Sequence, residues 1–255
     1  MTEQRTYEWY VQRLGKITSS GIEALMKDHK EAMTEQELAE WKKENPKSRV
    51  TTKVVPFSDA TYTYLDTRIL ENYLPLKSED QLTQNIVQEY IEDRQIHTKA
   101  VEYGTLMESA AREKYAEVMG YEVYEVGFIP YQKYPNLVGG SPDGMIREEP
   151  GIIEIKSPWT LEKHLQHLLY ESPDDLLANE PVYYWQCCAN MLFTDTQFCD
   201  FISYCPYVSL SKQLKVLRIP RTDFDMKMLD ERIDLAVDYM KQKMHQLDNI
   251  QTIIK

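Results

Sequence analysis

The 255-residue chain has 29 basic and 41 acidic side chains, which give a formal net charge of −12 at pH 7. No apolar run approaches the ~20 residues of a membrane span, and the first residues lack the apolar core of a signal peptide. The acidic balance argues only mildly against nucleic-acid binding, because a local basic groove can coexist with an acidic exterior, and the length suits one large domain or two small ones.

The N-terminal residues 7–26 predict two short helices, interrupted by the segment Arg13-Leu14-Gly15-Lys16-Ile17-Thr18-Ser19-Ser20. Ser19 or Ser20 is a suitable N-cap for a helix over residues 21–27. Free backbone amides at such a helix start, beside Arg13 and Lys16, form a potential anion site. An ordinary cap with solvated basic neighbours explains the same residues, and the local features alone favour that explanation.

The chain from residue 28 to residue 119 predicts mainly helices. Residues 28–56 predict a surface helix over 34–44 followed by a loop, Ser58 caps a helix to about residue 72, and residues 77–98 predict an exposed helix. In the helix expected over 101–119, Glu108 shares the apolar face formed by Val101, Gly104, Met107, Ala111, Tyr115 and Val118. A buried carboxylate is costly unless it is paired, protonated or bound to a cation, and Arg112, four residues on, is its ordinary partner.

Residues 121–130 predict a strand, and residues 137–146 and 151–157 predict a hairpin that turns near Glu148 and Glu149. On the second strand Glu154 and Lys156 share one face, about 6.6 Å apart, because side chains alternate along a strand. Ile153 and Ile155 fall on the opposite face and are expected to be buried. This register places Asp143 beside or nearly opposite Glu154.

The last third of the chain predicts a helix over 161–170, an acidic loop at 173–175, and a helix over 181–193 that is apolar nearly all round. Gln186 is the polar exception in that helix, and a satisfied core glutamine is its ordinary explanation. The four cysteines (Cys187, Cys188, Cys199 and Cys205) lack CxxC spacing, which favours buried free thiols in a reducing cytoplasm over an iron–sulfur cluster. Strands over 198–205 and 214–219 precede a long helix, 223–247, whose apolar stripe suits core packing or a subunit contact.

Two carboxylates and an amine projecting from adjacent strands are suited to binding a hard divalent cation. Carboxylates with one lysine, and no His or Cys cluster at ligand spacing, favour Mg²⁺ or Mn²⁺ over zinc. Asp143 and Glu154 supply oxygens, Glu108 adds a third or holds a second ion, and Lys156 orients a water or stabilises developing charge. The chemistry indicated is phosphodiester hydrolysis, although Asp…Glu-x-Lys spacing by itself is common.

Pro142-Asp143 with Glu154-Ile155-Lys156 resembles the PD-(D/E)xK nuclease signature, and the wider chain resembles the phage lambda exonuclease (YqaJ-type) recombination nucleases. Four blocks in the expected order, between Trp9 and Thr194, support the resemblance. They are Arg13-Leu14-Gly15-Lys16-Ile17-Thr18-Ser19-Ser20; Gly104-xxx-Glu108-xx-Ala111; Ser141-Pro142-Asp143-Gly144 with Glu154-Ile155-Lys156-Ser157-Pro158; and Tyr183-xx-Gln186 with Met191.

The resemblance implies an α/β fold with a PD-(D/E)xK restriction-endonuclease-like core, a central mixed sheet flanked by helices, and helical additions at both ends. It implies a single nuclease domain over 1–255, with an N-terminal helical DNA-end-binding part (about 1–100), a catalytic core (about 101–220) and a C-terminal helix (about 223–247). The implied activity is 5′→3′ digestion of one strand of linear double-stranded DNA, leaving a 3′ single-stranded overhang for annealing. The implied partners are a second and third copy in a ring, a trimer, and a single-strand annealing recombinase.

The same resemblance implies two Mg²⁺ or Mn²⁺ ions per site, with Asp143, Glu154, Glu108 and the backbone carbonyl of Ile155 as their ligands. Lys156 acts with the attacking water, and Gln186 helps to position the site. Arg13 and Ser20 bind the 5′-phosphate of the DNA end with Lys16 and Thr18 in the same block, and Trp9 contacts DNA near the entrance.

The sequence departs from the family pattern at Ser19, Ser157 and Cys188, none of which removes a metal ligand. Residues 27–56 have no clear counterpart in the family. Two alternatives stay open: an endonuclease of restriction or repair type, which would also cut closed circular DNA, and a non-catalytic DNA-end-binding protein on a nuclease scaffold. Retention of Glu108, Asp143, Glu154 and Lys156 argues against the second alternative.

Overall fold

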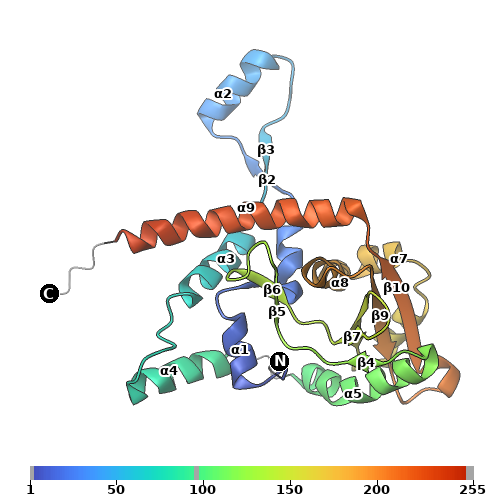
Figure 1. Ribbon diagram of the computed structural model, residues 1–255. Helices are drawn as coiled ribbons and strands as arrows, with labels where there is room; N and C mark the ends of the chain where they lie inside the picture. Colours follow the sequence, from blue (N-terminus) through green and yellow to red (C-terminus); the bar gives the residue numbers. More distant parts are fainter. Residues whose placement is uncertain (1–2, 95–97, 251–255) are drawn as a thin grey trace.

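The computed structural model describes residues 3–94 and 98–250 and contains a mixed α/β fold (Figure 1). Its central five-stranded sheet has the order β10-β9-β8-β7-β4. The strands are β4 (Val123–Tyr124), β7 (Gly144–Ile146), β8 (Gly151–Lys156), β9 (Phe198–Tyr204) and β10 (Leu214–Pro220). Only β8 and β9 are parallel, and the chain between them forms α6 (Leu161–Leu168), α7 (Pro173–Asn179) and α8 (Pro181–Thr194).

The β7–β8 hairpin has the predicted register. Gly144 pairs with Ile153 and Met145 with Ile152, so the turn is centred between residues 148 and 149, and Asp143 follows one step on, opposite Glu154. Ile153 and Ile155 are buried against α5 (Lys99–Met119), as expected. The other face is buried as well, because α8 covers it, and Glu154 is only 1% exposed.

Two predicted strands are each divided between two sheets. Residues 121–130 form β4 and, separately, β5 (Ile129–Pro130), while 137–146 form β6 (Val138–Gly140) and β7. The second sheet has the order β1-β6-β5, in which β1 (Ile17–Thr18) runs parallel to β6. At Gly140 a Cβ would collide with Asn190 and Ser19, so glycine permits this close approach of the two segments. The break between β6 and β7 leaves residues 141–143 outside the strands, although the Asp143 backbone N–H donates to the Ile153 carbonyl at 3.1 Å.

The main core lies between α8, α9 (Asp223–Asp248), α3 (Asp59–Glu71) and the short 3₁₀ helix η1 (Ser19–Leu25). Along α9 the predicted apolar stripe is fully buried within the chain at Leu229, Ile233, Ala236, Val237 and Met240. This stripe is therefore core, which excludes it as a subunit contact. The α-helix predicted over 21–27 is wrong, since the 3₁₀ helix begins at Ser19, and the capping residue is Thr18, without a side-chain cap bond.

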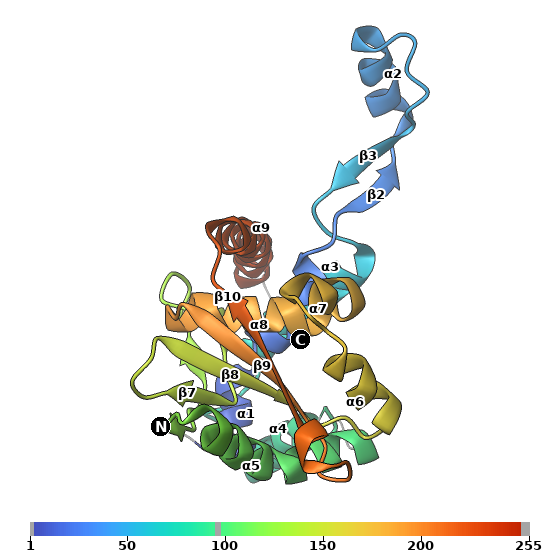
Figure 2. The same ribbon diagram turned by 90° about the vertical axis from the view of Figure 1, so that its right-hand side faces the viewer.

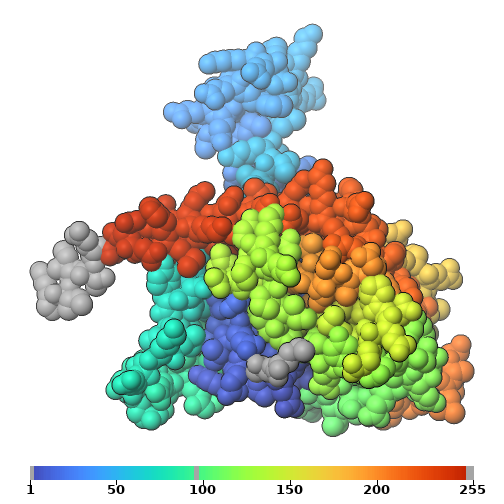
Figure 3. Space-filling model, in the orientation of Figure 1, coloured from blue at the N-terminus to red at the C-terminus, as the bar shows by residue number. Residues whose placement is uncertain are grey.

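Residues 28–56 form an arm that projects from the body (Figures 2 and 3). The arm comprises β2 (His29–Ala32) and β3 (Thr52–Val55), which pair antiparallel, and α2 (Glu35–Glu44) between them. The helix was predicted, but the loop expected after it is wrong because its end folds into the hairpin. We refer to residues 28–56 as the arm.

The remaining helices refine the predicted boundaries. α1 (Tyr7–Arg13), α3 with its Ser58 cap, and α5 match, but α4 (Gln81–Glu92) is shorter than the predicted 77–98, of which residues 95–97 lie outside the described part. The acidic loop at 173–175 is instead α7, because Ser172 and Asp175 form a capping box and Pro173 starts the helix. A second 3₁₀ helix, η2 (Leu210–Lys212), precedes β10. No helix in the described ranges is long and apolar enough to span a bilayer.

Candidate active site

One cleft of about 630 Å³ collects most of the predicted site residues. Its walls come from segments far apart in sequence: the N-terminal residues with α1 and η1, the start of α5, the loop before β7, the end of β8, α6 and α8. The predicted site residues that line it are Trp9, Arg13, Ser20, Glu108, Asp143, Glu154, Ile155, Lys156 and Gln186.

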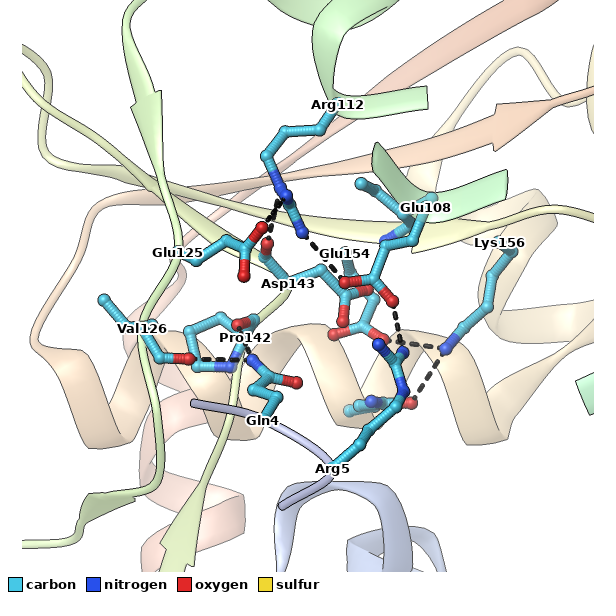
Figure 4. Close-up of polar contacts among 12 residues, drawn as sticks. Gln4, Arg5, Glu108, Arg112, Glu125, Val126, Pro142, Asp143, Glu154 and Lys156 are labelled. Carbon is cyan, nitrogen blue, oxygen red and sulfur yellow. Dashed lines mark hydrogen bonds and ion pairs between the residues drawn. The ribbon is translucent and has the colours of Figure 1, made fainter. Parts of the chain in front are cut away.

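The acidic hairpin forms the floor of the cleft (Figure 4). The Asp143 carboxylate accepts the backbone N–H of Ile155 at 2.7 Å. The Lys156 ammonium donates to Glu154 Oε1 at 2.7 Å and to Gln186 Oε1 at 3.4 Å. Asn190 donates to the other Glu154 oxygen at 3.1 Å. The hairpin therefore brings both carboxylates and the lysine together, as the sequence predicted.

Charge in this floor is poorly balanced. Burial raises the pKa of Asp143 well above its usual value, and the negative charges of Glu154 and Glu108 raise it further. Burial lowers the pKa of Lys156, but the carboxylates of Glu154 and Asp143 outweigh burial and hold this pKa above its usual range. Asp143 thus bears carboxylate repulsion that one lysine does not relieve.

Glu108 is buried, at 8% exposure, and pairs with Arg112 as its ordinary partner, with 2.8 Å between Nη2 and Oε1. Its neighbours on α5 differ from the predicted stripe, because Val101 and Val118 are exposed, whereas Tyr103, Ala111 and Tyr115 are buried. The centre of the predicted stripe, Ala111 and Tyr115, is therefore buried as expected, and its two ends are not.

A second guanidinium was not anticipated in the site: Arg5 forms an ion pair with the other Glu108 oxygen (Figure 4). Arg5 has φ +65°, a left-handed conformation that is uncommon for a side-chain-bearing residue. The preceding Gln4 donates to the carbonyls of Val126 (2.8 Å) and Pro142 (3.0 Å), so the segment is held in place across the cleft. Nothing in the local pattern at residues 4–5 indicates this contact.

The phosphate-binding residues predicted near the N-terminus gather at one end of the cleft. The Arg13 guanidinium donates to Ser20 Oγ at 3.1 Å and lies 4.2 Å from the centroid of the Trp9 ring. Trp9 Nε1 donates to Ser141 Oγ at 3.0 Å. Burial lowers the pKa of Arg13 to about 10, so it remains a cation at neutral pH. These four residues, Trp9, Arg13, Ser20 and Ser141, we call the anchor cluster.

Lys16 and Thr18, predicted with the same block, lie outside the cleft lining. Lys16 Nζ lies 5.8 Å from the centroid of the Phe128 ring, and Thr18 Oγ1 contacts Ser20 Oγ at 3.2 Å. Thr18 therefore contacts Ser20 from outside the cleft lining. Ser141 and Asn190 were missed as site residues, although Ser141 belongs to the Ser-Pro-Asp-Gly block and Asn190 shares a helix face with Gln186.

The carboxylates of Asp143, Glu154 and Glu108 are ligands that a hard cation prefers. In this structure each of them pairs with other groups of the protein. Among residues 3–94 and 98–250, no three His, Cys, Asp or Glu side chains converge as a ready metal cluster. Glu108 is directed to Arg5 and Arg112 instead of toward Asp143 and Glu154. The raised pKa of Asp143 nevertheless marks excess negative charge, which a divalent ion at these oxygens would neutralise.

This fold matches known exonuclease structures along nearly the whole chain. The alkaline exonuclease LHK-Exo from Laribacter hongkongensis aligns with a TM-score of 0.64 and 23% identity, covering 95% of this chain and 96% of that one. The same enzyme in complex with dAMP gives a TM-score of 0.65 at the same identity and coverage. A phage-related exonuclease from Haemophilus somnus 129PT gives 0.58 and 13% identity, covering 91% of this chain and 96% of that one.

The sequence of the chain identifies its family as well. Residues 8–197 match the YqaJ-like viral recombinase domain, and the chain belongs to that family. This membership confirms the resemblance drawn from the four sequence blocks. No match was found among curated proteins. The solved exonuclease structures, at 13–23% identity, show a likeness of fold.

Proposed function

We propose that the protein is a metal-dependent 5′→3′ exonuclease that digests one strand of linear double-stranded DNA and leaves a 3′ single-stranded overhang for recombination by annealing. Family membership and the exonuclease folds of its structural relatives support this activity. The observation that carries it is the sharing of one cleft by Asp143, Glu154 and Lys156 with the anchor cluster. A hydrolytic centre that shares a cleft with a guanidinium and serine hydroxyls suits a substrate with a phosphorylated end.

The proposed roles follow from the family resemblance and from the chemistry of the side chains. Asp143, Glu154, the Ile155 carbonyl and Glu108 would hold Mg²⁺ or Mn²⁺, two ions per site. A metal held there would polarise a phosphoryl oxygen and lower the pKa of bound water. Lys156, fixed by Glu154 and Gln186, holds a donor proton at the attacking water.

At the other end of the cleft, Arg13 and Ser20 bind the 5′-phosphate, and Trp9 positions the guanidinium by stacking. Thr18 and Lys16 assist from outside the cleft lining, through Ser20 and through the electrostatic field respectively. A guanidinium with two serine hydroxyls within reach offers a fork of donors for phosphate oxygens.

The proposal extends to the architecture and the partners. The five-stranded sheet with α5 and α8 is the PD-(D/E)xK core, within a single nuclease domain over residues 1–255. The protein acts as a homo-oligomeric ring, a trimer, together with a single-strand annealing recombinase. Its place of action is the cytoplasm of a bacterium or phage-infected host, and four buried free cysteines are consistent with a reducing compartment.

The direct test compares three substrates with Mg²⁺: 5′-phosphorylated linear duplex, 5′-hydroxyl linear duplex and covalently closed circular DNA. Degradation of the phosphorylated linear DNA is expected to be faster by about 10- to 100-fold than of the hydroxyl form, from the 1.5–3 kcal/mol of a charge-assisted hydrogen bond. Circular DNA should stay intact. Cutting of the circle would favour the endonuclease, and equal rates on both linear forms would remove the phosphate-anchor assignment.

Lys156→Ala separates catalysis from binding in the same assay. Loss of the proton donor should lower cleavage by about 10²–10⁴-fold, the usual contribution of a positioned acid or base. Binding of the phosphorylated duplex without metal should persist, since the anchor cluster is untouched. Unchanged cleavage by this variant would place the catalytic centre elsewhere, and no cleavage by the unaltered protein would leave a non-catalytic end-binding protein.

A further inference from the structure

An aromatic and apolar wall faces the cleft on the side of α5, and the roles above do not use it. Trp159 follows β8 by three residues, lines the cleft, and is 55% exposed, the most exposed of the four tryptophans in the chain. Val101, Gly104 and Pro158 line the cleft beside it. An indole left this open beside a catalytic floor indicates a surface built to be covered.

Aromatic contacts fix the orientation of the Trp159 side chain. The Tyr103 ring, 7% exposed, contacts the Trp159 ring edge to face, with centroids 5.4 Å apart and an interplanar angle of 80°. Tyr207 stacks on the far side of Tyr103 at 6.1 Å and 23°. The buried tyrosine therefore fixes the orientation of the indole and keeps it from collapsing onto the body.

The α5 side of the cleft wall is open at Gly104. A Cβ at Gly104 would meet no atom within 4 Å, and Val101, which lines the same cleft, is 45% exposed. Glycine inside a helix lowers stability by about 1 kcal/mol relative to alanine. At position 104 it leaves open a slot that any larger side chain would fill. The cleft thus has a charged floor and an apolar wall slot.

We propose that this slot, formed by Trp159, Val101, Gly104 and Pro158, binds an unpaired nucleobase of the DNA end. The inference rests on the proposed function, because the slot is continuous with the cleft that would hold the phosphodiester. Every base has a flat π-face that stacks on an aromatic ring irrespective of sequence. A terminal nucleotide whose phosphate lies on the floor must leave its base pair, and an apolar slot accommodates that base.

A different occupant, a second copy of this chain, would be expected on the adjoining face. Helix α6 exposes Leu161, Leu165 and Leu169 at 55–69% and buries its histidines, so its leucine row is open to the outside. Those leucines lie outside the cleft lining, whereas Trp159 belongs to it. The position of the indole within the cleft favours the nucleobase.

The test is a binding experiment with the full chain in chelator, so that cleavage plays no part. Two 5′-phosphorylated duplexes with a short unpaired 5′ end are compared, one carrying thymines and the other abasic sites at the unpaired positions. The unaltered protein should bind the thymine probe about 5- to 100-fold more tightly, from the 1–3 kcal/mol of one base stacking on an aromatic ring. Trp159→Ala and Gly104→Leu should each abolish this preference, and Trp159→Phe should retain part of it.

Trp41→Ala is the matched control, because Trp41 is also exposed, at 38%, but lies on the arm. It should keep the full preference. Equal affinity of the unaltered protein for both probes, or an intact preference in Trp159→Ala, overturns the slot. Loss of self-association in Trp159→Ala by sedimentation, with the preference intact, overturns it too and assigns the wall to a second copy.

The two proposals fail differently in these experiments. If the protein prefers the thymine probe but does not degrade DNA with Mg²⁺, the proposed slot stands and the proposed exonuclease activity is wrong. If the protein degrades linear DNA but binds both probes equally, the proposed exonuclease activity stands and the proposed slot is wrong.

Discussion

The cleft is held together by contacts between residues far apart in the chain, whereas the arm is held together by local contacts. In the cleft, Arg5 reaches Glu108 and Trp9 reaches Ser141, residues 103 and 132 positions apart in the chain. In the arm, Glu37 bonds Thr34 three residues away and Lys53 sixteen residues away. The cleft therefore exists only when the whole chain folds, whereas the arm is a local addition that stands clear of the body (Figure 3).

Carboxylate side chains have pKa values shifted in opposite directions in the two regions. In the arm, the Lys53 ammonium and the Thr34 donors lower the pKa of Glu37 to about 2. In the cleft, burial and neighbouring carboxylates raise the pKa of Asp143. Carboxylates of the arm are satisfied locally, but those of the cleft are left in mutual repulsion, which is typical of a site that sacrifices stability for function.

Removing the Arg5 cation should change the affinity of the cleft for a metal ion. Arg5→Gln should tighten Mn²⁺ binding by about two- to fivefold, because a partly exposed ion pair contributes 0.2–1 kcal/mol that a metal at Glu108 must overcome. Calorimetric titration with Mn²⁺ in the absence of DNA measures the change. Arg5→Lys, which keeps the charge, should fall between the two.

Two controls locate that effect. Arg147→Gln removes an exposed arginine paired with Glu122, far from the cleft lining, and should leave Mn²⁺ affinity unchanged. Glu108→Gln should weaken binding in both backgrounds. Weaker Mn²⁺ binding by Arg5→Gln than by the unaltered protein would show that Arg5 supports the metal site instead of competing with it.

Asp143→Asn should stabilise the metal-free protein by about 1 kcal/mol, a rise in Tm of about 2–4 °C for a chain of this size. Asparagine keeps an acceptor for the Ile155 N–H and removes the repulsion from Glu154 and Glu108. Since the folded pKa of Asp143 is raised, its ionisation destabilises the fold as pH rises from the usual aspartate value through the raised one. The gain should therefore grow as pH rises above the usual aspartate value and disappear in acid.

Thermal unfolding in chelator at neutral and acidic pH measures this gain. Glu37→Gln in the arm is the matched control: its carboxylate has a lowered pKa, so replacing it should give no rise at neutral pH. A Tm for Asp143→Asn at or below that of the unaltered protein would mean that the carboxylate is already neutralised within the fold.

The sequence predicted the parts of the site that depend on local periodicity. The turn centre between residues 148 and 149 fixed the register, so Asp143, Glu154 and Lys156 could be placed from alternation alone. Glu108 could be placed as well, because helical periodicity put it on a buried face. The fold class followed from the order of elements and the family blocks.

Contacts between distant segments could not be predicted in this way. Nothing in residues 4–5 indicates a partner at Glu108, and the division of residues 137–146 between two sheets depends on how closely β6 approaches α8. The β2–β3 hairpin of the arm was missed for a related reason. Its strands are short and largely exposed, so hydrophobic alternation, the usual signal of a strand, is weak.

The smallest effect is expected from removing the arm. His29 and Val55 are paired across β2 and β3, so a short glycine-serine turn joining them can replace residues 30–54. The contacts of Arg232 with Asp28 and with the Pro56 carbonyl, at the base of the arm, are kept. Cleavage of phosphorylated linear duplex should stay within about twofold, as for surface changes away from packed features, and the measurement is the initial rate alongside Tm. A tenfold loss with unchanged Tm would place the arm in the path of the DNA or in a subunit contact.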